Sequence, residues 1–117
     1  MSKIIVVTGA SRGIGRSIVK LAALRGYTVY ALSRNIKNLD STNLIYPVSI
    51  DISDENSVSD FKLKLEKNKV IVDALINNAG SFLNKPFSKT TTCKLEFNCF
   101  NLIFRFGSEI IARCRVF

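Results

Sequence analysis

The chain has 117 residues, of which 47% are hydrophobic, a composition typical of one compact unit with a buried core and not of a disordered segment. It contains no apolar stretch of membrane-spanning length and too few apolar residues after Met-Ser-Lys for a secretory signal, so we expect a cytoplasmic protein without a membrane partner. The net charge of +8 comes from scattered basic residues outside any nucleic-acid-binding motif, and the three cysteines lack metal-ligand spacing and come with no histidine, so we expect neither a nucleic-acid partner nor a metal site.

The first part of the chain predicts a strand followed by a helix. The β-branched run Ile4-Ile5-Val6-Val7 indicates a strand over residues 3–8 that is buried on both faces. A helix is expected over residues 13–25, and Gly26 ends it. The buried face of this helix is expected to consist of four apolar residues, Ile14, Ile18, Leu21 and Ala22.

The following segments predict three more strands and a second helix. Strands are expected over residues 28–32, 44–50 and 70–76, and Pro47 favours an outer position for the strand that contains it. Ser53 is expected to cap the helix that precedes the last strand. The buried stripe of that helix is expected to comprise Val58, Phe61 and Leu65. Strands that alternate with helices in this way require a parallel sheet with right-handed crossovers, so the predicted fold class is α/β.

A glycine-rich segment, Thr8-Gly9-Ala10-Ser11-Arg12-Gly13-Ile14-Gly15, joins the first strand to the first helix. Gly9 allows a tight turn after the strand, and Gly13 allows a pyrophosphate to approach the backbone. Gly15 allows the helix to pack closely on the sheet. A strand, a glycine-rich turn and a helix in this order present backbone N–H groups to a phosphate, so the segment predicts a dinucleotide site.

Two motifs together resemble the short-chain dehydrogenase/reductase family. The first is the G-x-x-x-G-x-G spacing of the glycine segment, and the second is Asn77-Asn78-Ala79-Gly80 after the apolar run 74–76. The resemblance implies a Rossmann-like, doubly wound parallel sheet, truncated here to the strand order 3-2-1-4 with flanking helices. The resemblance runs from Lys3 to about Thr90 and becomes poor after that. Residues 1–90 are the expected NAD(P)-binding unit, and residues 91–117 are a divergent hydrophobic tail.

The residues after the second strand favour NADP(H) over NAD(H) as the cofactor. NAD-binding sites usually carry an acid there that binds the ribose 2′-hydroxyl, whereas this chain has Ser33-Arg34 and no acid before Asp40. A guanidinium can bind a 2′-phosphate through paired, charge-assisted hydrogen bonds. The resemblance implies the same role for Arg12.

The resemblance also assigns residues at the ends of the third and fourth strands. It implies that Asp51 accepts a hydrogen bond from the adenine amino group, with the backbone of Ile52 alongside. The small residues after the fourth strand would let the cofactor ribose lie close to the backbone, whereas Asn77 is expected to tie neighbouring strands together. The complete set of expected cofactor-binding residues is Gly9, Ser11, Arg12, Gly13, Ile14, Gly15, Ser33, Arg34, Asp51, Ile52, Asn78, Ala79 and Gly80.

The family's catalytic residues have no counterpart in these 117 residues. The resemblance implies a serine and a Tyr-x-x-x-Lys pair, in which the lysine lowers the pKa of the tyrosine. None of the three tyrosines, Tyr27, Tyr30 and Tyr46, has a lysine four residues later. We therefore assign no catalytic residue and expect this chain by itself to be inactive. Asn98 and Asn101 are both candidates for an asparagine that the family carries, and the choice stays open.

Residues 91–117 contain every cysteine and read as an almost entirely apolar helix. Two explanations of this apolar helix stay open: burial in a homo-oligomer, and an aberrant, frame-shifted ending. The loss of resemblance favours the second.

Three functions stay open for the chain. It is the NADP(H)-binding portion of an alcohol or carbonyl oxidoreductase, a non-catalytic dinucleotide-binding module, or an inactive fragment.

Overall fold

The computed structural model describes residues 2–79, which contain four strands and two helices. In chain order these are β1 (Ile4–Thr8), α1 (Gly13–Leu24), β2 (Thr28–Ser33), β3 (Ile45–Ser49), α2 (Glu55–Lys67) and β4 (Ala74–Ile76). The alternation of strands and helices is as predicted. The predictions for Gly80, the tail at 91–117, its subunit contact and the asparagines at 98 and 101 lie outside the described residues.

The four strands form one parallel sheet in the order β3-β2-β1-β4, which confirms the predicted order. Val6 of β1 pairs with Tyr30 of β2 on one side and with Leu75 of β4 on the other, so β1 lies inside the sheet. Within the described part of the chain, β3 pairs with β2 alone, which agrees with the outer position that Pro47 predicted.

Strand β4 is shorter than the expected range 70–76, and Asp73 explains where its pairing with β1 begins. The Asp73 N–H donates to the Ile4 carbonyl at 2.9 Å, and the Ile4 N–H donates to Asp73 Oδ2 at 2.7 Å. The Asp73 side chain thus accepts the hydrogen bond from the Ile4 N–H that a backbone carbonyl would accept in regular strand pairing. Regular pairing starts one residue later, at Ala74 opposite Ile5.

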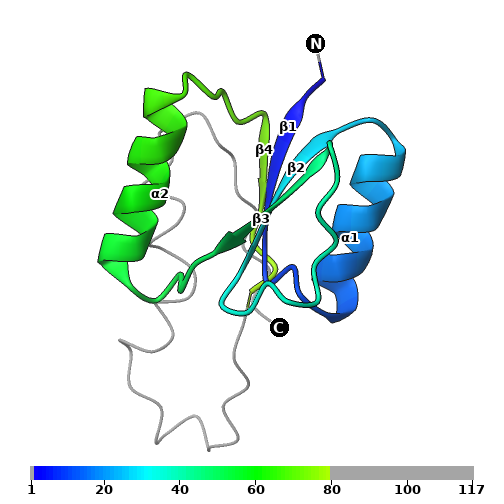
Figure 1. Cartoon of the computed structure of the whole chain (residues 1–117), viewed down its shortest axis with the longest axis horizontal. Helices are drawn as coiled ribbons and strands as arrows, with labels where there is room; N and C mark the ends of the chain where they lie inside the picture. The colour runs from blue at the N-terminus through cyan, green and yellow to red at the C-terminus, as the bar shows by residue number, and fades with distance from the viewer. Residues whose placement is uncertain (1, 80–117) are drawn as a thin grey trace, which may run out of the picture.

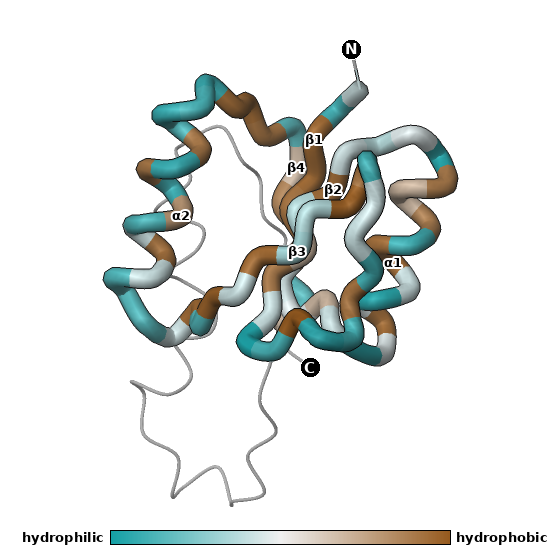
Figure 2. Tube along the Cα trace, viewed as in Figure 1, coloured by the Kyte–Doolittle hydropathy of each residue, from teal (hydrophilic) through white to brown (hydrophobic). Residues whose placement is uncertain are grey.

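The two helices cover opposite faces of the sheet, as the edge-on view of Figure 1 shows. This gives three layers, the Rossmann-like arrangement that the sequence predicts. Figure 2 shows apolar strands between helices whose polar residues face outward. The buried cluster on the α2 side contains Val6, Leu32, Ile50, Val58, Phe61, Leu65 and Leu75. The cluster on the α1 side contains Val7, Ala10, Val19, Ala22, Val29, Ala31 and Ile45.

The predicted buried face of α1 is partly wrong. Ile14 is 73% exposed and Leu21 is 52% exposed, and the residues that α1 buries are Gly15, Val19 and Ala22. These three have the i, i+4, i+7 spacing of one helix face. The face is rotated from the hydropathy prediction because α1 presents Gly15, and not a side chain, to the loop that follows β1.

Helix α2 buries Val58, Phe61 and Leu65 as predicted, but Ser53 is not its cap. The N-cap is Asp54, whose carboxylate accepts from the Asn56 N–H at 3.1 Å and from the Ser57 hydroxyl at 2.9 Å. No helix among residues 2–79 is long and apolar enough to cross a membrane.

Candidate functional site

The loop from β1 to α1 exposes the start of a helix without a side-chain cap. Gly9 and Gly13 have φ values of +63° and +60°, which residues with a side chain rarely adopt. Arg12 is the N-cap of α1, but it makes no side-chain capping bond, and the first turn contains no acid. Within the described part of the chain, neither the Arg12 side chain nor an acid in the first turn accepts from the first N–H groups of α1, which carry the positive end of the helix dipole. This is the chemistry that binds a phosphate.

Thr8 fastens this loop to the segment after β4. Its side chain is buried, and its Oγ1 accepts hydrogen bonds from the N–H groups of Asn78 and Ala79, both at 3.0 Å. The Asn78 side-chain amide in turn donates to the Gly9 carbonyl at 3.2 Å. These bonds hold together the two sequence motifs that indicated the family, although about 70 residues separate them in the chain.

Two glycines allow this close approach. A Cβ on Gly9 would lie 2.9 Å from the Ala79 Cα and 3.1 Å from the Asn78 amide nitrogen. A Cβ on Gly15 would overlap the Gly9 carbonyl oxygen. Gly15 was expected to allow packing of the helix on the sheet. The atoms nearest to it belong instead to Gly9 and Asn78, so this glycine packs α1 against the loop.

The ends of β2 and β3 supply the charged part of the site. Asp51 follows β3, and its Oδ1 accepts from the Ser53 hydroxyl at 2.6 Å and from the Ser53 N–H at 3.0 Å. The hydroxyl bond is the largest cause that lowers the pKa of Asp51, and the N–H bond and the nearby charge of Arg34 add to it. Asp51 is therefore an ionised acceptor at neutral pH.

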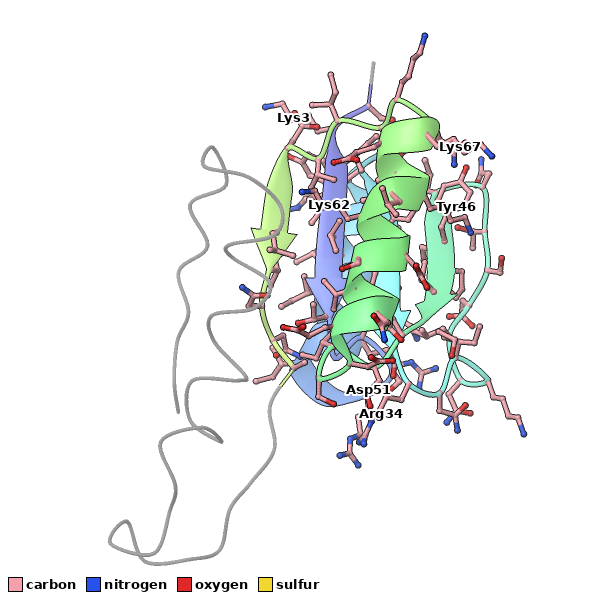
Figure 3. The ribbon with its side chains drawn as sticks, turned by 90° about the vertical axis from the view of Figure 1, so that its left-hand side faces the viewer. Lys3, Arg34, Tyr46, Asp51, Lys62 and Lys67 are labelled. Carbon is pink, nitrogen blue, oxygen red and sulfur yellow. The ribbon has the colours of Figure 1, made fainter. Side chains whose placement is uncertain are left out.

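These segments surround one cavity of about 460 Å³ at the carboxyl ends of the strands. Figure 3 shows Arg34 and Asp51 beside each other at this end of the sheet, whereas Lys3 lies at the opposite end. The expected cofactor-binding residues that line the cavity are Gly9, Ser11, Arg12, Gly13, Ser33, Arg34, Asp51, Ile52, Asn78 and Ala79. Ile14 and Gly15 are expected residues that do not line it.

Three lining residues were absent from the prediction: Leu32, Ile50 and Ser53. The first two are apolar strand residues that hydropathy assigns to the core, and they are buried as well as adjacent to the cavity. Asp51 gave a usable signal for Ser53, because an aspartate carboxylate often accepts from the backbone N–H two residues later. The Asn77 side-chain amide nitrogen is buried and has no hydrogen-bond partner in the described part of the chain. The strand tie expected of Asn77 stays a prediction. Residues 2–79 contain no group of three or more metal-binding side chains.

A parallel sheet covered on both faces, with a glycine-rich turn and a cavity at its carboxyl end, defines a protein of the Rossmann-like class. The family model described as short chain dehydrogenase matches residues 3–102. The chain therefore belongs to the short-chain dehydrogenase family, whose members are NAD(P)-dependent oxidoreductases.

Individual relatives cover different parts of the chain. It is 42% identical over 77 residues to a probable short-chain type dehydrogenase/reductase, VdlC, of Helicobacter pylori, in a match that covers 64% of this chain and 28% of the relative. It is 35% identical over 108 residues to the NADPH-dependent 1-acyldihydroxyacetone phosphate reductase of Saccharomyces cerevisiae, covering 86% of this chain and 36% of that one.

Among solved structures, a short-chain dehydrogenase from Leptospira borgpetersenii with bound NAD+ is similar, with a TM-score of 0.75 and 26% identity. That match covers 89% of this chain and 42% of the other. The chain thus spans less than half the length of each of these three proteins.

Proposed function

We propose that this chain is the NADP(H)-binding portion of an oxidoreductase that, as a whole protein, transfers hydride between NADP(H) and an alcohol or carbonyl compound. The observation that carries the proposal is the position of Ser33-Arg34 on the cavity wall, where β2 ends. An acid in this place would accept a hydrogen bond from a ribose 2′-hydroxyl, whereas a guanidinium binds a 2′-phosphate.

The other lining residues fit the rest of a dinucleotide. In the proposed complex the pyrophosphate binds at the uncapped start of α1, next to Gly13 and Arg12. The ionised Asp51 accepts from the adenine amino group. Asn78 and Ala79, which line the cavity, lie beside a ribose of the cofactor. The nicotinamide, when bound, supplies the hydride, and the residues of this chain hold and orient the cofactor.

Similar proteins include both kinds of cofactor user. The Saccharomyces cerevisiae reductase is NADPH-dependent by name, and the Leptospira structure contains NAD+. The choice of NADP(H) therefore rests on this chain's own Arg34 and Arg12. Both line the cavity, where Asp51 is the single acid among the described lining residues.

A second candidate function is a non-catalytic dinucleotide-binding module. In these 117 residues no tyrosine has a lysine four positions later. A proton donor aligned with the substrate oxygen is needed for efficient turnover, and general acid catalysis contributes about 10²–10⁴-fold. Incubating the purified chain with NADPH and a panel of aldehydes and ketones tests the module, because NADPH consumption would rule it out. Binding without consumption is expected of both functions, since the binding portion by itself contains no Tyr-x-x-x-Lys pair.

The cofactor assignment is tested by titrating NADPH and NADH into the wild-type chain and into Arg34→Ala by calorimetry. Hydrogen bonds to charged groups contribute about 1.5–3 kcal/mol, so the substitution should lower the preference for NADPH by about 10-fold to 150-fold. Lys37→Ala removes a nearby positive charge that does not line the cavity, and it should leave most of the preference intact. Equal affinity of the wild-type chain for both cofactors would contradict the proposal.

A further inference from the structure

The backbone of Arg34 is held by a side chain from the neighbouring strand. The last pair in the β2–β3 register is Ser33 opposite Ser49, and the Ile50 N–H donates to the Ser33 carbonyl at 2.9 Å. Arg34 comes one residue after β2. Its carbonyl accepts a hydrogen bond from the Ser49 hydroxyl at 3.1 Å, so this side chain extends the strand pairing by one residue.

We infer that Ser49 is a positioning residue that sets the cofactor preference by fixing Arg34 at the cavity wall. The inference rests on the proposed function, in which Arg34 binds the 2′-phosphate. Ser49 is exposed and is not among the residues that line the cavity, so it acts through Arg34 and does not touch the cofactor.

The geometry of guanidinium binding explains why the position of the backbone matters. A forked pair of hydrogen bonds to a phosphate requires a defined direction of approach, and a long side chain on a mobile backbone loses more freedom when it binds. Arg34 begins the irregular connection between β2 and β3, in which the nearest side-chain bond is local, from the Lys37 N–H to Asn35 Oδ1. The Ser49 bond spans 15 residues and ties the start of this connection to the sheet.

The effect of Ser49 should be confined to the 2′-phosphate. Other bonds hold the other parts of the site. Thr8 fixes Asn78 and Ala79 beside the glycine loop, and Ser53 fixes Asp51. Loss of the Ser49 hydroxyl leaves these bonds in place. We therefore expect it to weaken discrimination between phosphorylated and unphosphorylated ribose without weakening adenosine binding in general.

The experiment measures the affinity of the full chain for 2′,5′-ADP and for 5′-AMP, two probes that differ at the ribose 2′ position. Ser49→Ala should reduce the preference for 2′,5′-ADP by about 3-fold to 10-fold, because the coupling cannot exceed the net contribution of one hydrogen bond. Its affinity for 5′-AMP should stay within about twofold of wild type. Ser49→Thr keeps the hydroxyl and should retain the preference.

Ser2→Ala is the matched control, because it removes an exposed hydroxyl bond, to Thr28 Oγ1, at the opposite end of β2. It should change neither affinity. Melting temperatures of all variants show whether they fold. Should Ser49→Ala fail to fold, Ser49→Cys, with its weak thiol donor, replaces it and should show a smaller loss of the same preference.

Three results overturn the inference. An unchanged preference in folded Ser49→Ala shows that Arg34 needs no such support. An equal loss of affinity for both probes shows a structural role only. A wild-type chain that binds both probes equally well refutes the proposed role of Arg34 itself, and Arg34→Ala, with unchanged affinities, identifies that case.

Discussion

The hydroxyl of Thr8 accepts a hydrogen bond from the main-chain N–H of Asn78, 70 residues further along the chain. The same oxygen accepts from the Ala79 N–H and lies 3.5 Å from the Ile76 carbonyl, to which it donates. A single buried side chain thus sets the distance between the glycine loop and the segment that follows β4. The shape of the cavity therefore depends on a residue that does not line it.

Thr8→Val tests this dependence. The substitution keeps the shape of the side chain but leaves two partly buried N–H groups without their acceptor. A buried donor left unsatisfied costs about 1–3 kcal/mol, so we expect the free energy of unfolding to fall by about 2 kcal/mol or more in urea denaturation. NADPH affinity should fall as well. Thr28→Val, which removes a bond to the exposed Ser2 hydroxyl, should change stability by less than about 0.5 kcal/mol. Equal effects of the two substitutions would contradict the role assigned to Thr8.

The glycines of the loop should respond differently to the same change. Gly15→Ala places a Cβ against the Gly9 carbonyl, a backbone atom that cannot move aside, and should destabilise the protein by about 1–3 kcal/mol. The Cβ of Gly13→Ala meets no atom within 4 Å among residues 2–79, apart from its chain neighbours and the backbone of its own helix, and the cost of the substitution arises from the positive φ, about 1–2 kcal/mol. Because Gly13 lines the cavity, Gly13→Ala should also weaken NADPH binding at temperatures where the variant is folded. Chemical denaturation and calorimetry distinguish the two effects, and unchanged affinity in folded Gly13→Ala would make this glycine a turn residue only.

Most of the sheet and cavity could be predicted from sequence because parallel strands bring distant motifs to one edge. The residues after β1, β2, β3 and β4 meet there whatever the details of packing. The buried face of α1 could not be predicted, because hydropathy favours Ile14 over Gly15 for the interior. Gly15 is buried instead and Ile14 is exposed, because the buried position lies so close to the Gly9 carbonyl that a side chain does not fit there. The cap of α2 was misassigned for a similar reason: Ser53 and Asp54 are both good caps, and Ser53 is engaged by Asp51.

Lys69, two residues after the end of α2, has a conformation that favours glycine. Its φ is +54°, and the bonds from the Lys69 N–H to the Glu66 carbonyl and from the Val70 N–H to the Leu65 carbonyl close the helix end. A left-handed conformation costs a residue with a Cβ about 1–2 kcal/mol, so Lys69→Gly should raise the free energy of unfolding, by about 0.5–1 kcal/mol after the entropy of the unfolded glycine is subtracted. Asn68→Gly, at a φ of −86°, gains no such relief and should be neutral or destabilising. A Lys69→Gly variant less stable than wild type in thermal melts would refute the cap geometry.

The pKa of Asp51 provides a direct test of the charged part of the cavity. Ser53 lowers this pKa mainly through its hydroxyl, so Ser53→Ala should raise it toward the usual aspartate value, about 3.9. Because the folded pKa lies below the unfolded one, the stabilisation is complete above the unfolded value and disappears as the pH falls through the folded value. The stability difference between wild type and Ser53→Ala should therefore be constant near neutral pH and shrink in acid.

NMR titration of the Asp51 carboxyl carbon measures the pKa. Ser57→Ala, which removes a comparable bond to Asp54, is the control that should leave the pKa of Asp51 unchanged. If Ser53→Ala leaves the pKa of Asp51 where it is in wild type, the Ser53 hydroxyl does not control this carboxylate. Arg34→Ala then distinguishes the two remaining causes, because it raises the pKa if the charge of Arg34 dominates and leaves it unchanged if the Ser53 N–H bond dominates.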